Sequence, residues 1–75
     1  MNKDRIVITF PNETQVLRFE TILKKNKIKC KLIPIPREIS SGCGIAIQTD
    51  ADEKNIINEL ISINNISING IHENV

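Results

Sequence analysis

The hydrophobic positions follow two different periods along the chain, and the changes of period predict four strands and two helices. β-Branched residues run from Arg5 to Phe10 and end at Pro11, as in a buried central strand. Apolar and polar residues then alternate over 28–33 and again over 44–49, which is typical of strands with one solvated face. Near the end of the chain, Ile66, Ile68 and Ile71 indicate a fourth strand.

Two segments between these strands have the period of amphipathic helices. The first begins after Asn12, a good N-cap residue, with Gln15 in the capping-box position. Asp50 and Glu53 take the same two positions at the start of the second, which runs to Asn64 and Asn65. We expect the buried stripes to consist of Val16, Leu17, Phe19, Glu20, Ile22 and Leu23 in the first helix, and of Ile56, Ile57, Leu60, Ile61 and Ile63 in the second.

The resulting order, βαββαβ, predicts a single α+β domain over 1–75 with the ferredoxin-like arrangement. In that arrangement two helices cover one face of an antiparallel four-stranded sheet. Since the crossovers are right-handed, the loop after the second strand lies at the same end of the molecule as the start of the first helix.

Composition and charge narrow the possible partners. The 75 residues carry a formal net charge of +1 and contain no Trp or Tyr, so we expect neither a nucleic-acid nor a membrane partner. We interpret the lysines between Lys24 and Lys31 as a solvated face. No segment has the length of apolar residues that a membrane span or signal peptide needs, and we therefore expect a cytoplasmic protein.

The unusual residues gather between Pro34 and Gly44, a segment that contains Cys43 between Gly42 and Gly44. A cysteine reacts as its thiolate, and a nearby helix N-terminus or cation lowers its pKa. The first helix and Arg37 could do this, although Glu38 could oppose it or pair with Arg37. The flanking glycines would leave the sulfur accessible, and Ser40 and Ser41 add hydroxyl donors. The alternative is that Cys43 only fills space in a loop.

The other residues with reactive side chains fit structural roles. Cys30 alternates with Ile28 and Leu32, which indicates a small buried hydrophobe. Two cysteines at this spacing form neither a redox pair nor a tetrahedral metal site, so we expect no metal and no bound cofactor. His72 has no partner at ligand spacing and is interpreted as a surface residue. The acidic residues at the start of the second helix fit its dipole rather than an acid/base pair.

The segment Pro36 to Gly44, Pro-Arg-Glu-Ile-Ser-Ser-Gly-Cys-Gly, together with the opening Ile-Val-Ile-Thr-Phe-Pro-Asn, resembles the small bacterial proteins described as selenium/sulfur (Se/S) carrier-like. The resemblance extends over nearly the whole chain. It implies that Cys43 carries sulfur or selenium as a persulfide or selenopersulfide, between a donor and an acceptor protein. It implies a carrier rather than a turnover enzyme.

A second hypothesis is a non-catalytic regulatory or assembly module. The outer face of the predicted sheet is apolar enough to be covered by a second copy of the chain, which would make a homodimer. We expect this face to consist of Val7, Thr9, Ile33, Ala46, Gln48 and Ile71. Replacing Cys43 would leave such a function intact, whereas a charge at Val7 or Ile33 would split the dimer.

Overall fold

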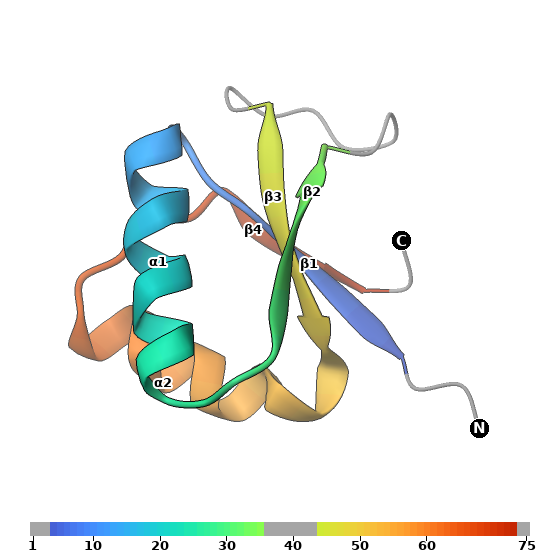
Figure 1. Cartoon of the computed structure of the whole chain (residues 1–75), viewed down its shortest axis with the longest axis vertical. Coiled ribbons are helices and arrows are strands. Elements are labelled where there is room, and N and C mark those ends of the chain that lie inside the picture. The colour runs from blue at the N-terminus through green and yellow to red at the C-terminus, as the bar shows by residue number, and fades with distance from the viewer. Residues whose placement is uncertain (1–3, 36–43, 74–75) are drawn as a thin grey trace.

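The computed structural model describes residues 4–35 and 44–73, and these form the predicted βαββαβ order (Figure 1). The elements are β1 (Arg5–Thr9), α1 (Glu13–Lys25), β2 (Cys30–Pro34), β3 (Ile45–Asp50), a short 3₁₀ helix η1 (Ala51–Glu53), α2 (Lys54–Ile63) and β4 (Gly70–Glu73).

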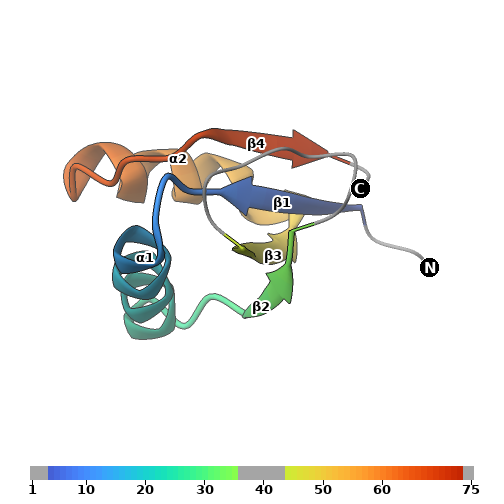
Figure 2. The same ribbon diagram turned by 90° about the horizontal axis from the view of Figure 1, so that it is seen from above.

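The four strands form one sheet in the order β2-β3-β1-β4, and every neighbouring pair is antiparallel. Seen from above, both helices lie on the same side of this sheet (Figure 2). The strand between β1 and β2 is β3, so that the crossover through α1 passes over one strand. The predicted α+β, ferredoxin-like fold is confirmed.

The core fills the space between the helices and the inner face of the sheet. Strand residues Ile6, Ile8 and Ile47 are inaccessible to solvent, as are Phe10 and Phe19, whose ring centroids lie 6.0 Å apart. Such a tilted ring pair adds a little to the gain from burial. The helices complete this core with Val16, Leu23, Ile57 and Leu60.

The start of α1 follows the sequence signals in part. The side chain of Asn12 accepts a hydrogen bond from the backbone N–H of Gln15 at 3.1 Å, as an N-cap residue does. The Gln15 side chain accepts from the backbone N–H of Ser67 at 3.4 Å, so its amide ties α1 to the segment before β4. At the other end, Lys27 has a positive φ of 58°, and Ile28 N–H donates to Leu23 O at 2.9 Å.

The predicted cap of the second helix and three of the predicted stripe residues are wrong. Asp50 does not cap α2 with its side chain, because η1 separates β3 from α2 and the Asp50 carboxylate makes no capping hydrogen bond. Leu17 is 51% exposed and Ile63 is 74% exposed, so neither belongs to a buried stripe. Ile56 is also exposed, since the buried side of α2 is the narrower one that carries Ile57 and Leu60.

The last strand is shorter than the isoleucine pattern predicted. Ile66 is buried in the core and Ile68 packs against it, but both precede β4. The connection ends at Asn69, which donates from its backbone N–H to Thr9 O at 2.7 Å. Strand pairing then starts at Gly70, opposite Thr9.

Two isoleucines of α2, one buried and one exposed, allow a test of which side chains stabilise the fold. Ile57→Val removes a methylene from a fully buried site and is expected to lower the free energy of unfolding by about 1 kcal/mol. Ile63→Val makes the same change at a site that is 74% exposed, and we expect an effect below about 0.5 kcal/mol. Urea unfolding followed by circular dichroism measures both, and equal losses would contradict this assignment of the core.

Candidate functional site

The segment with the unusual residues joins β2 to β3, and the described residues fix where it leaves and rejoins the sheet. Pro34 pairs with Ile45, and Ile35 N–H donates to Gly44 O at 3.2 Å. The predicted site residues Arg37, Glu38, Ser40, Ser41, Gly42 and Cys43 lie outside the described residues. Gly44 is the one predicted site residue that the described part of the chain contains.

Gly44 lies at an open position at the start of β3. A Cβ added there would meet no heavy atom within 4 Å, and its φ is not positive. Neither crowding nor backbone conformation therefore requires glycine at this position. The space around Gly44 itself is therefore open.

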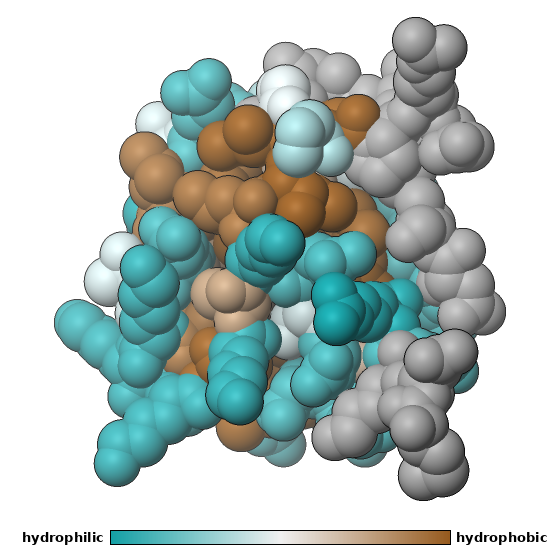
Figure 3. Space-filling view, turned by 45° about the vertical axis from the view of Figure 1, so that its right-hand side comes forward, coloured by the Kyte–Doolittle hydropathy of each residue, from teal (hydrophilic) through white to brown (hydrophobic). Residues whose placement is uncertain are grey.

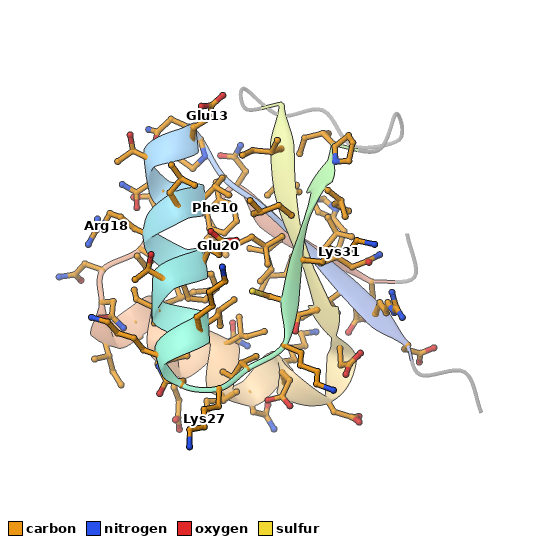
Figure 4. The ribbon with its side chains drawn as sticks, viewed as in Figure 1. Phe10, Glu13, Arg18, Glu20, Lys27 and Lys31 are labelled. Carbon is orange, nitrogen blue, oxygen red and sulfur yellow. The ribbon has the colours of Figure 1, made fainter. Side chains whose placement is uncertain are left out.

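The start of α1 lies at the same end of the molecule as Pro34 and Gly44, as predicted (Figure 1). The attraction of this helix end for an anion is weaker than the sequence suggested. The Asn12 side chain already accepts from one of the free N–H groups of the first turn. The Glu13 carboxylate extends from the same turn at this end (Figure 4), where it repels a nearby anion.

Cys30, the cysteine that the structure describes, is half-buried on the side of β2 that faces α1 and packs against the core. Burial raises the pKa of its thiol, and the Glu20 carboxylate raises it further, while Lys24 acts in the opposite direction. Glu20 and Lys24 form an ion pair at 3.5 Å, so their opposing effects offset one another. Figure 4 shows Glu20 on the strand-facing side of α1. Cys30 is therefore a protonated thiol and a weak nucleophile, in keeping with its predicted structural role.

His72 is not the free surface residue that the sequence indicated. It belongs to β4, is half-buried, and its Nε2 lies 3.5 Å from the hydroxyl of the buried Thr9. A Cβ on Gly70 would lie 3.4 Å from the same nitrogen, so the small residue leaves room for the imidazole. The isoleucine pattern placed the fourth strand over Ile66 to Ile71, whereas β4 runs over Gly70–Glu73 and therefore includes His72.

The outer face of the sheet differs from its prediction. Val7 and Ala46 have no exposed surface, and Ile33 and Ile35 pack against them. Ile71 pairs with Ile8 and packs against the helix-side core, so it lies on the opposite face. Its assignment to the outer face was wrong because one residue of register moves every side chain of a strand to the other side.

The structure is thus a small ferredoxin-like domain. Its segment with the unusual residues joins β2 to β3 at one end of the sheet. Residues 5–73 match the model of the family described as "Putative Se/S carrier protein-like", and the chain belongs to this family. No curated protein and no solved structure matched it. Within residues 4–35 and 44–73, no helix has the length and apolarity needed to cross a membrane, and no group of His, Cys, Asp and Glu side chains could hold a metal ion.

The environment of Cys30 predicts slow alkylation. In a Cys43→Ser variant, where Cys30 is the remaining thiol, we expect iodoacetamide to react with the folded chain only at a pH above that needed by the same chain in denaturant. A raised pKa means that the folded chain holds the thiol proton more tightly. This contribution to stability is present below the pKa of the unfolded chain and is lost as the pH rises through that of the folded chain. Alkylation rates measured against pH check the order, and a folded chain reacting at the lower pH would contradict it.

Proposed function

We propose that this protein carries sulfane sulfur or selenium on Cys43 and passes it to a partner protein. The observation that carries the proposal is the match to the Se/S carrier-like family over residues 5–73, a range that includes Cys43. The family description names the cargo, and a cysteine side chain is the group in this chain that can bind it covalently.

Two features of the described residues support the proposal: the open space at Gly44 and the raised pKa of Cys30. Gly44, directly after Cys43 in the chain, has open space around it, which suits a sulfur that must enter the active site of another protein. Cys30 is half-buried, and burial raises the pKa of its thiol. Since the pKa of Cys30 is raised, its thiolate is scarce at neutral pH, and Cys43 is the better candidate for transfer chemistry.

The transfer would proceed by two thiolate attacks without net oxidation. The Cys43 thiolate attacks the outer sulfur of a donor persulfide, a new S–S bond forms at Cys43, and the donor leaves as its own thiolate. An acceptor thiolate then attacks the outer sulfur of the Cys43 persulfide, and Cys43 leaves as a thiolate. A selenium atom in place of the outer sulfur follows the same balance.

The groups that would stabilise the anionic sulfur come from the segment itself more than from α1. Since Asn12 and Glu13 reduce the attraction of the α1 N-terminus for an anion, Arg37 and the backbone N–H groups of Gly42 and Gly44 become the more important candidates. Ser40 and Ser41 would add hydroxyl donors. If Glu38 opposes Arg37, Arg37→Gln and Glu38→Gln act in opposite directions on the reactivity of Cys43. If Glu38 holds Arg37 in position, both substitutions lower that reactivity.

The central test is the formation of a sulfur adduct. After incubation with a cysteine desulfurase and cysteine, we expect intact mass to show one added sulfur, and peptide mapping to place it on Cys43. Cys43→Ser should abolish the adduct, whereas Cys30→Ser, the same substitution at a protonated thiol, should retain the yield of the unsubstituted chain within about twofold.

Two outcomes would contradict the proposal: no adduct on the unsubstituted chain, or an adduct that survives in Cys43→Ser and disappears in Cys30→Ser. Replacing cysteine by selenocysteine, with a lyase that releases its selenium, compares the two cargoes on the same residue. A higher yield with one of them identifies the preferred element.

A further inference from the structure

The outer face of the sheet contains a hollow of about 240 Å³ at the end remote from Gly44. Arg5 at the start of β1 and Lys29 before β2 line it, together with Lys31, Gln48 and Asp50. Backbone register places Arg5 opposite Asp50 and Lys31 opposite Gln48, so these four side chains leave the sheet on the face away from the helices. Figure 4 shows Lys31 directed away from α1.

The charges around this hollow are unbalanced. Arg5, Lys29 and Lys31 are cationic, and Asp50 is the one carboxylate among the lining residues. Within the described part of the chain, neither Lys29 nor Lys31 forms an ion pair, and Asp50 forms none with Arg5. Figure 3 shows that hydrophilic residues dominate the lower part of the surface on this side, while hydrophobic residues gather toward the upper end. A concave surface with excess positive charge concentrates anions.

The backbone and one of the cations are held in place before any ligand arrives. Arg5 Nη1 donates to Gln48 Oε1 at 3.2 Å, which directs the guanidinium across β3. The buried Thr49 donates from its hydroxyl to Lys29 O at 2.7 Å, and Ala51 N–H donates to Asp4 O at 2.9 Å. These bonds tie β1, β3 and the start of β2 together, so a ligand would meet a rigid floor.

We propose that this hollow binds a small oxyanion of the phosphate or sulfate class through Arg5, Lys29 and Lys31. An arginine presents several N–H donors in a plane, and two lysines add charge without fixed geometry, a combination that suits tetrahedral anions. The hollow is smaller than the clefts that enclose drug-sized ligands, so the anion itself, rather than a large organic body, is what it contacts.

The hollow lies at the opposite end of the sheet from Pro34 and Gly44, where the segment that contains Cys43 leaves and rejoins it. Strand β3 connects the two, with Asp50 at the hollow and Ile45 beside Gly44, a span of about 17 Å at the usual rise of a strand. The anion site does not depend on the proposed carrier function, and Cys43→Ser is expected to leave anion binding unchanged. Failure of one proposal is therefore distinguishable from failure of the other.

Titration of the isotopically labelled chain with inorganic phosphate, at a constant ionic strength kept with sodium chloride, tests the site by NMR. We expect saturable shifts of the backbone amides of Arg5, Gln48 and Asp50. Arg5→Gln or Lys31→Gln should weaken the affinity by about tenfold, and the same titration with AMP shows whether the group is bound equally well on a larger molecule.

Two further variants make the test specific. Lys25→Gln removes an exposed lysine of α1 outside the hollow and should change the affinity by less than about twofold. Asp50→Asn removes the one opposing carboxylate and should tighten binding, without loss of a helix cap because Asp50 makes no capping hydrogen bond. Shifts that do not saturate, an equal loss in Lys25→Gln, or weaker binding in Asp50→Asn would overturn the proposal. Lys31 lies on an exposed edge strand, so Lys31→Gln keeps the test valid if Arg5→Gln fails to fold.

Discussion

The burial of β1 on both faces is the constraint on which the rest of this structure depends. Ile6 and Ile8 pack toward the helices, and Val7 and Thr9 lie on the other side, yet all four are almost inaccessible. With β3 on one side and β4 on the other, β1 is the central strand that both halves of the chain must join. A domain of this size has little other core, so the register of β1 fixes the position of every neighbouring element.

Two regions with different chemistry lie at opposite ends of the sheet. At one end of the sheet, Pro34 and Gly44 mark the departure and return of the segment that contains Cys43. At the other end, Arg5 and Asp50 begin β1 and finish β3 beside the cationic hollow.

The environment of each thiol follows from its element. Cys30 points from β2 toward α1, where burial and the carboxylate of Glu20 both favour the protonated form. The apolar core thus protects one cysteine from the chemistry proposed for the other. On the outer face, the strand likewise sets the surroundings of Thr9. Its buried hydroxyl donates to Gly70 O at 3.3 Å and lies close to the imidazole of His72, so this polar group is not left without a partner.

The sequence by itself determined the order of the elements, because hydrophobic period is a local property. Three local patterns can be recognised without tertiary contacts: the run from Arg5 to Thr9, the cap at Asn12 and the alternation around Ile47. Together with the other elements they predicted the ferredoxin-like fold. The sequence also singled out the family's cysteine-containing segment, since its residue types are unusual for a helix or strand.

Tertiary structure decided on which face of the sheet or helix each side chain lies and which residues it contacts there. Ile71 lies toward the helices because β4 pairs with β1 in one register, and Ile63 is 74% exposed although it continues the apolar period of α2. The cationic hollow was invisible in the sequence for the same reason. Arg5, Lys31 and Gln48 are far apart along the chain, and only the pairing of β1, β3 and β2 brings them to one surface.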